Sequence, residues 1–281
     1  MNKDFLVFGC SLSYGHELKD APHNEVLAGV IKPSKFSWPA LLGALNYSVP
    51  GSSNDRIKRN CIHTTSTLRP KLVGISWSFP ERQELPDHTT DKENPEGDYF
   101  TNMGHWIQGR KNKFDIRNCI KPHLDTRNSV LWYKFVDIYY KMVYSDVYGM
   151  YRFLDNVYMT QLHLESLDTE YFMVVPSHKT LQLNTGAGNL ITGNPNNIPS
   201  TPSRYIFDYQ DDTINMDKII GSVVRTRKLI DWSKFIFIEN DISKYNGIMD
   251  IGKKLNDIGK AGHPLEKSHK HYANYLKDVT I

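Results

Sequence analysis

Short apolar runs, separated by longer stretches of mixed polarity, set the pattern of this chain. Each run is four to six residues long, rich in β-forming side chains and bounded by glycine, proline or polar residues. Runs of this length and character are typical of strands buried on both faces of a parallel sheet. We therefore expect strands at residues 4–8, 46–49, 72–77, 171–175 and 235–238.

The stretches between these runs carry apolar residues at helical spacing. Pro39 suits the first turn of a helix over 38–45, and Asn54 suits the N-cap of one over 54–68. Residues 129–167 predict one long helix, or two helices broken near Gly149. Further helices are expected over 217–230 and 266–277. Strands that alternate with helices predict an α/β fold, here a three-layer α/β/α sandwich around a five-stranded parallel, flavodoxin-like sheet.

Two polar segments, about 85–128 and 181–212, are longer than this fold requires. Each leaves the carboxyl end of an expected strand, which is where open α/β sheets bind their ligands. We interpret them as lids or substrate-selecting loops, with peripheral decoration or subunit contact as the alternative. The expected organisation is one domain over residues 1–281 with these two insertions.

The composition of the chain limits the compartments and the partners that we expect for it. The 34 basic and 31 acidic residues leave a formal charge of +3, which gives no electrostatic reason to expect a nucleic acid partner. Cys10, Cys61 and Cys119 are too few and too scattered for a disulfide framework or a zinc site, so a reducing compartment is expected. No signal peptide and no apolar stretch of about 18 residues is present, so no membrane partner is expected.

Ser11 is the first candidate for chemistry. It follows the first expected strand in the sequence Phe8-Gly9-Cys10-Ser11-Leu12-Ser13-Tyr14-Gly15-His16. At the carboxyl end of a strand, its hydroxyl would project into the ligand crevice, near backbone N–H groups that can stabilise an oxyanion. The alternative is that Ser11 or Ser13 caps a helix. A serine nucleophile needs a base, and His263, in the turn Gly262-His263-Pro264, is the strongest candidate among eleven histidines.

Four blocks of this chain resemble, in their order and spacing, the motifs of the SGNH, or GDSL-like, hydrolases. Gly9-Cys10-Ser11-Leu12 is similar to the Gly-Asp-Ser-Leu block, with cysteine in place of aspartate. Pro50-Gly51-Ser52-Ser53-Asn54 and Val73-Gly74-Ile75-Ser76-Trp77-Ser78 are similar to the second and third blocks, and Gly262-His263-Pro264 to the last. The likeness is closest to small SGNH-like proteins of bacteriophages.

The resemblance implies that Ser11 is the nucleophile and His263 the general base. Members of the family usually carry an aspartate three residues before the histidine, and that position is Lys260 here. Asp257, six residues before His263, is the expected replacement if its loop bulges outward. A backbone carbonyl that orients the ring, in a catalytic dyad, is the alternative.

The resemblance also implies an oxyanion hole formed by the N–H groups of Ser11 and Gly51. The third block lacks the asparagine of the family, so the Ser78 hydroxyl would replace that donor, or Asn54 would supply an amide instead of capping its helix. Arg82 would either bind a substrate carboxylate or phosphate or form an ion pair with a neighbouring acid.

The expected activity is serine-dependent hydrolysis of an ester, with O-acetyl groups on a carbohydrate as the substrate class that the resemblance implies. Two alternatives stay open: an acyltransferase on the same site, and a catalytically decayed structural or binding protein of a phage. No cofactor and no metal is expected, because the sequence has neither a metal-binding histidine pair with a third ligand nor a glycine-rich phosphate loop. The expected location is the cytoplasm, that of a host cell if the protein is phage-encoded, or a virion, and a homo-oligomer is compatible with either.

Overall fold

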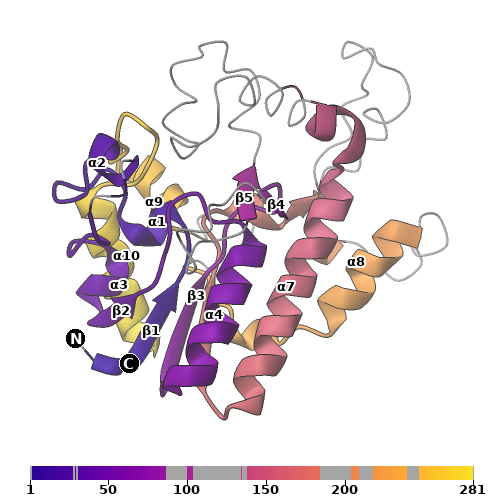
Figure 1. The fold of residues 1–281 in the computed structure, drawn as a ribbon, viewed down its shortest axis with the longest axis horizontal. Coiled ribbons are helices and arrows are strands. Elements are labelled where there is room, and N and C mark those ends of the chain that lie inside the picture. Colours follow the sequence, from indigo (N-terminus) through magenta and orange to yellow (C-terminus); the bar gives the residue numbers. More distant parts are fainter. Residues whose placement is uncertain are drawn as a thin grey trace.

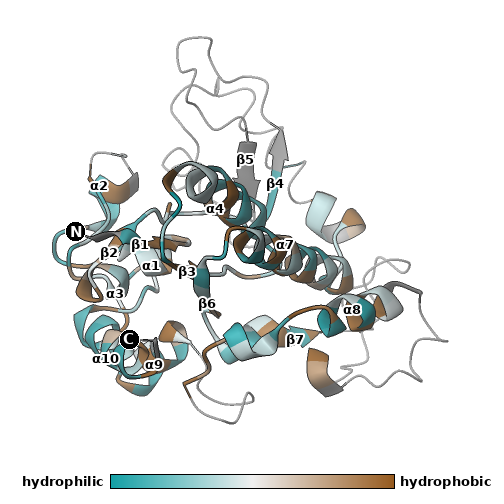
Figure 2. Cartoon of the chain, turned by 90° about the horizontal axis from the view of Figure 1, so that it is seen from below, coloured by the Kyte–Doolittle hydropathy of each residue, from teal (hydrophilic) through white to brown (hydrophobic). Residues whose placement is uncertain are grey.

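The computed structural model describes residues 2–27, 29, 31–86, 100–103, 134, 138–183, 204–208, 218–238 and 247–280. These residues form a parallel sheet with helices on both faces, which Figures 1 and 2 show from two directions. The predicted α/β class is confirmed.

The central sheet has four parallel strands within the described ranges. They are β1 (Asn2–Phe8), β2 (Ala44–Asn46), β3 (Leu72–Ser76) and β6 (Glu170–Val174), in the order β2-β1-β3-β6. The chain adds β2 on one side of β1 and then β3 and β6 on the other. The order therefore reverses between β1 and β3, and the carboxyl end of this pair is the crevice in which such sheets bind ligands.

The expected fifth strand, at residues 235–238, is reduced to one bridge. Phe235 pairs in parallel with Met173, and the Ile236 N–H donates to the Met173 carbonyl at 2.9 Å. The Phe237 carbonyl instead accepts the Tyr275 hydroxyl at 2.9 Å, so a side chain from the C-terminal helix, α10 (Glu266–Thr280), binds a backbone group that would otherwise pair with a neighbouring strand. The segment thus lies beside Met173 but forms a single bridge with it. The prediction of a five-stranded sheet is therefore wrong for the described residues.

Alternation along the strands assigns the two faces of the sheet. Leu6 and Phe8 of β1 pack with α4 (Asn54–Leu68) and α7 (Asp146–Ser166), and α8 (Lys218–Lys228) lies beside α7. Phe5 and Val7, which point the other way, pack with α3 (Trp38–Leu41), α9 (Ile248–Lys254) and α10 (Glu266–Thr280). Figure 2 shows these two groups of helices on opposite sides of the sheet.

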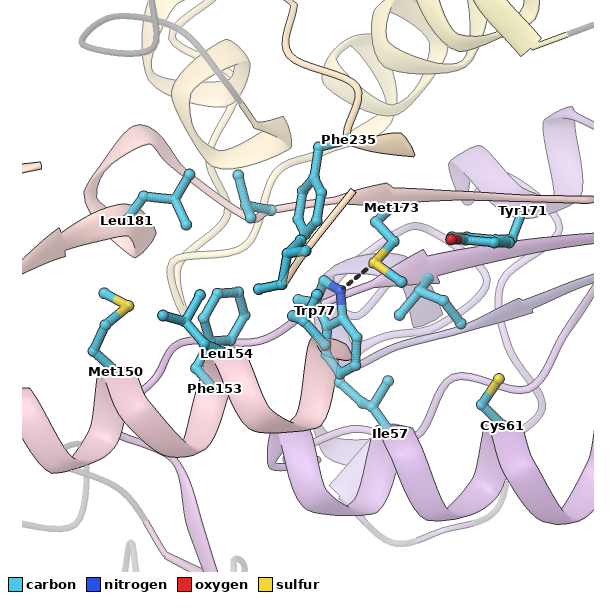
Figure 3. Packing of buried hydrophobic residues seen from close by; sticks show 14 of the residues in the cluster. Ile57, Cys61, Trp77, Met150, Phe153, Leu154, Tyr171, Met173, Leu181 and Phe235 are labelled. Carbon is cyan, nitrogen blue, oxygen red and sulfur yellow. Dashed lines mark hydrogen bonds between the residues drawn. The ribbon is translucent and has the colours of Figure 1, made fainter. Parts of the chain in front are cut away.

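Trp77 belongs to the core rather than to the surface of the site. It is fully buried against the sheet, and its Nε1–H donates to the Met173 sulfur at 3.3 Å (Figure 3). Its ring meets the Phe153 ring of α7 edge to face.

Two helix predictions need correction. The helix expected over 38–45 ends at Leu41, because Gly43 turns the chain at φ 80° and Ala44–Asn46 then joins the sheet as β2. The break expected near Gly149 lies earlier, at Tyr144 and Ser145, between a π-helical turn (Tyr139–Val143) and α7. Gly149 lies inside α7, where a Cβ would come within 2.2 Å of the Tyr144 hydroxyl, so it makes room for that ring. Most of 129–137 lies outside the described residues.

The two insertions contribute short antiparallel pairs that are separate from the main sheet. In the first, β4 (Gln83–Pro86) pairs with β5 (Phe100–Met103). In the second, β7 (Gln182–Leu183) pairs with β8 (Arg204–Tyr205), and Leu181, Leu183 and Ile206 are buried in the core. The remainder of the segments 85–128 and 181–212 lies outside the described residues. No helix in the described ranges is long and apolar enough to cross a bilayer.

Candidate active site

Ser11 begins the four-residue helix α1 (Ser11–Tyr14) directly beyond the carboxyl end of β1. The turn depends on Gly9, since a Cβ there would lie 2.1 Å from the Ser13 Oγ and 2.9 Å from the Ser76 Cβ. Ser11 Oγ lies 3.0 Å from His263 Nε2. The two residues that the sequence proposed as nucleophile and base are therefore in hydrogen-bonding contact, although 252 positions separate them.

The loop between α9 and α10 presents His263. Ile258 and Pro264 form an antiparallel bridge, and the Gly259 N–H donates to the His263 carbonyl at 2.7 Å. Gly262 turns the chain at φ 91°, a conformation that favours glycine. This small hairpin fixes the imidazole against α1.

Glu17 provides the carboxylate beside His263. Its Oε2 lies 3.1 Å from His263 Nδ1 and accepts the His263 backbone N–H at 3.0 Å, while its Oε1 accepts the Ala261 N–H at 2.7 Å. The side chain is 9 % exposed, so the pair is largely shielded from water. With Nδ1–H donating to Glu17, the neutral imidazole presents Nε2 as the acceptor for the Ser11 hydroxyl.

Glycine at position 259 makes room for this carboxylate. A Cβ there would lie 2.7 Å from the carboxyl carbon of Glu17 and within 2.8 Å of both its oxygens. Glu17 itself has a φ of 74°, which is uncommon for a residue with a side chain. The backbone after α1 and the hairpin around His263 are thus shaped around the carboxylate.

Burial and charge set the protonation states of the pair. Burial is the largest influence on His263 and lowers its pKa, Glu17 acts in the opposite direction, and the charges of Arg82 and His23 lower it again; the net pKa lies below the usual value of 6.5. Burial raises the pKa of Glu17, but the hydrogen bonds from Ala261 and His263 outweigh it and leave that pKa below its usual value. At neutral pH the pair is a carboxylate and a neutral imidazole.

The expected contact between Asp257 and His263 is not present. The Asp257 carboxylate accepts the Ser268 N–H at 2.7 Å and the Ser268 hydroxyl at 2.8 Å, so it caps the first turn of α10. Lys260 lies exposed in the turn. Sequence reasoning missed Glu17, whose only signal is its position six residues after Ser11 in a loop that begins with a glycine.

Gly51 lies beside the strand end that carries Ser11. It has a φ of 79° in a turn that the Ser52 N–H closes onto the Val49 carbonyl at 3.2 Å, as in a type II turn. The Val49 N–H donates to the carbonyl of Gly9 at 3.0 Å. This bond holds the second block next to the first, as the resemblance implies.

The Asn54 side chain joins the second block to the third. Its Oδ1 accepts the Ser78 N–H at 2.7 Å, and its Nδ2 lies 3.3 Å from the carbonyls of Ser78 and Phe79. Its amide is thereby engaged with backbone, and the N-cap of α4 is Ser53, whose hydroxyl accepts the Arg56 N–H. These contacts with the backbone of the third block replace both roles expected for Asn54, that of N-cap and that of oxyanion donor. The buried Ser78 Oγ has no hydrogen-bond partner within the described ranges.

Arg82 lies at the same end of the sheet as His263. Its Nη1 lies 3.5 Å from the Ser52 carbonyl, its guanidinium carbon lies 5.5 Å from the centre of the Phe79 ring, and its charge lowers the pKa of His263. Nearby, Asp55 contacts Arg152 at 2.6 Å, and Glu84 contacts Arg59 at 2.7 Å.

No group of three or more His, Cys, Asp or Glu side chains in the described part of the chain is arranged to hold a metal ion. Cys10, next to Ser11, and Cys61 are buried free thiols. Cys119 lies outside the described residues.

The matches of this chain to known proteins are matches to solved structures. No family model matches the sequence, and neither does any curated protein. Several solved structures match along the fold, and two of them are Axe2 variants. One is described as an acetyl-xylooligosaccharide esterase from Geobacillus, with 12 % identity, and the other as an acetylxylan esterase from Geobacillus stearothermophilus, with 11 % identity. Each match covers 99 % of this chain and 94 % of the other, with a TM-score of 0.40.

Proposed function

We propose that this protein is a serine ester hydrolase, with Ser11 as nucleophile, His263 as general base and Glu17 as the group that orients and stabilises the imidazole. The observation that carries the proposal is the unbroken chain of contacts from Ser11 Oγ to His263 Nε2, and from His263 Nδ1 to Glu17 Oε2. A hydroxyl becomes an effective nucleophile when a neutral imidazole, held in one tautomer, accepts its proton.

In the first half of the reaction, Ser11 Oγ attacks the ester carbonyl carbon while its proton moves to His263 Nε2. The carbon–oxygen bond to the alcohol then breaks, and the alkoxide leaves with that proton as an alcohol. In the second half, a water molecule gives a proton to His263 and attacks the acyl-serine, and the acid is released as Ser11 recovers its proton. Glu17 stays ionised throughout and stabilises the imidazolium at each step.

The developing oxyanion would accept hydrogen bonds from the N–H groups of Ser11 and Gly51. Neither N–H has an acceptor among the described residues, and the turn that contains Gly51 is tied to the strand end before Ser11. Backbone donors that are fixed before the reaction need no reorganisation as charge develops. The Ser78 hydroxyl is a third candidate donor.

Arg82 is proposed to bind a carboxylate or phosphate on the substrate. Its guanidinium lies near enough to lower the pKa of His263, and a planar guanidinium can hold such an anion with two hydrogen bonds. Arg82→Gln would then raise the KM for a carboxylate-bearing ester about tenfold and leave that for a neutral ester unchanged. An equal rise in the KM for both esters would show that Arg82 does not bind an anionic group of the substrate.

The test of the reaction is a panel of aryl acetates, longer aryl esters and O-acetylated oligosaccharides, the last being the class that the SGNH resemblance implies. The purified wild-type protein should release acid from at least one class, and Ser11→Ala should not. An acyltransferase would instead need an added alcohol or amine and would form a new ester or amide. No turnover of any ester by a folded wild-type protein, with or without an acceptor, would favour the structural or binding alternative.

A further inference from the structure

A column of three histidine rings stands beside the proposed nucleophile. His16 lies with its ring centre 4.3 Å from that of His263, with the planes inclined at 35°. The His16 ring also lies 4.8 Å from the ring of His23, nearly parallel to it, and His16 Nε2 is 2.9 Å from His23 Nδ1. His16 is 5 % exposed, whereas His23, the first residue of α2 (His23–Leu27), is exposed.

We propose that His16 is a positioning residue for the base: its ring packs on the His263 imidazole, helps to hold it between Ser11 and Glu17, and couples it to the exposed His23. The inference deepens the proposed ester hydrolysis and rests on it. His16 contacts neither of the reacting atoms described above, so it acts through His263.

The protonation states of the column differ along its length. Burial, together with the neighbouring His263 and His23, lowers the pKa of His16 to about 4, so this ring is neutral at neutral pH. A neutral ring between two others carries one N–H, and its position is set by the hydrogen bond to His23. Where the His23 Nδ1–H donates to His16 Nε2, the His16 proton lies on Nδ1.

His23, the exposed histidine of the three, therefore acts on His263 through its charge. A proton on His23 lowers the pKa of His263, so the base keeps its neutral form to lower pH. The sign is that of two like charges in proximity, each of which disfavours the other. The charged and titratable groups around His263 are Glu17 and His16 after α1, His23 on α2, Arg82 after β3 and His269 on α10.

Two substitutions distinguish the effect of the His16 ring on His263 from the effect of the His23 charge. His16→Gln places a polar atom near the original Nε2, so it can still meet His23, but it removes the ring from the face of His263. His23→Asn keeps a polar atom near the original Nδ1 and removes the charge that acts on His263. His63→Asn, at an exposed position of α4, is the matched control for loss of a histidine.

The measurement is the rate of inactivation by a fluorophosphonate as a function of pH, because this reagent reports an activated serine without requiring the natural substrate. His16→Gln should lower the plateau rate on the order of tenfold and move the acid midpoint to higher pH, since water then reaches His263. His23→Asn should keep the plateau and also move the midpoint to higher pH. His63→Asn should match the wild type.

The histidine ring resonances, followed by NMR titration of the same four proteins, give the pKa of His263 whether or not the reagent reacts. A His263 pKa that stays unchanged in both His16→Gln and His23→Asn would overturn the inference. So would a loss of rate in His16→Gln that matches its loss of folded protein, with an unmoved midpoint. If the wild type fails to react at Ser11 while the two variants still shift the pKa of His263, the ester-hydrolase proposal fails and the coupling stands.

Discussion

Glu17 accepts two hydrogen bonds from His263 on a single oxygen: Oε2 lies 3.0 Å from the backbone nitrogen and 3.1 Å from Nδ1. The other oxygen, Oε1, accepts the Ala261 N–H at 2.7 Å. One carboxylate thus fixes both the hairpin that carries the base and the orientation of its ring. The carboxylate comes from the loop that follows the nucleophile, rather than from the segment before the histidine.

Glu17→Gln should reduce the reaction of Ser11 strongly. An amide cannot serve all three donors: with its oxygen toward His263, its NH₂ group faces the Ala261 N–H, and with the reverse orientation it faces two donors on His263. Loss of the charge also removes the interaction that raises the pKa of His263. We expect the plateau rate to fall on the order of 10³-fold and the acid midpoint to move to lower pH. An unchanged midpoint in the pH–rate profile would contradict the assigned contact.

Gly259→Ala should mimic the loss of Glu17. The new Cβ would lie 2.7 Å from the carboxyl carbon of Glu17, which must then move away from His263. A displacement of this size should cost on the order of 100-fold in labelling rate. The double variant Gly259→Ala/Glu17→Asp, with a shorter acid, should recover part of that loss. Equal rates in wild type and Gly259→Ala would show that the hairpin tolerates the methyl group without moving the acid.

Asp257→Ala should affect stability and leave the reaction of Ser11 intact. The substitution removes the acceptor for the Ser268 N–H and hydroxyl at the start of α10. We expect a loss of about 1–2 kcal/mol in the free energy of unfolding, measured in urea, which is typical of a lost helix cap. If the pH dependence of labelling shifts while the folded fraction stays complete, Asp257 would have the role that we assign to Glu17.

Stability should fall with acid because of His269. Its Nδ1 accepts the Trp38 N–H at 3.0 Å, and burial lowers its pKa to about 3. Between that value and the unfolded value near 6.5, the unfolded chain binds the extra proton. Stability therefore declines as pH falls, by up to about 1.4 kcal/mol per pH unit from this group. His269→Asn, which retains an acceptor near Nδ1, should flatten this part of the urea-derived profile, and an equal slope in both proteins would contradict the assignment.

Local sequence was enough to find β1, β3 and β6 and the two residues that now lie in contact, Ser11 and His263. Each is marked by its immediate neighbours: an apolar strand and Gly9 before the serine, and Gly262 and Pro264 around the histidine. The α/β class followed from apolar runs alternating with helical stretches, and that signal does not require knowledge of tertiary contacts.

The acid could not be found in the same way, because its identity depends on a contact across 246 residues and on a backbone with positive φ at Glu17. Asp257 was favoured by its proximity in sequence, but it caps α10 instead. Ala44 and Leu45 were assigned to the end of a helix and the strand was expected over 46–49, because these two residues suit either structure. Pairing with β1 places the strand at Ala44–Asn46 instead. Tertiary contacts override local propensity at such positions.

The most direct test of the central claim is peptide-mapped mass spectrometry after fluorophosphonate treatment of the wild type, Ser11→Ala, His263→Ala and Glu17→Gln, each shown to be folded. In the wild type we expect one adduct, on the peptide that contains Ser11. In Ser11→Ala we expect no adduct at that site, and in His263→Ala and Glu17→Gln strongly slowed labelling. A folded wild type without an adduct on Ser11, or equal labelling in His263→Ala, would contradict the claim that these three residues form an active triad.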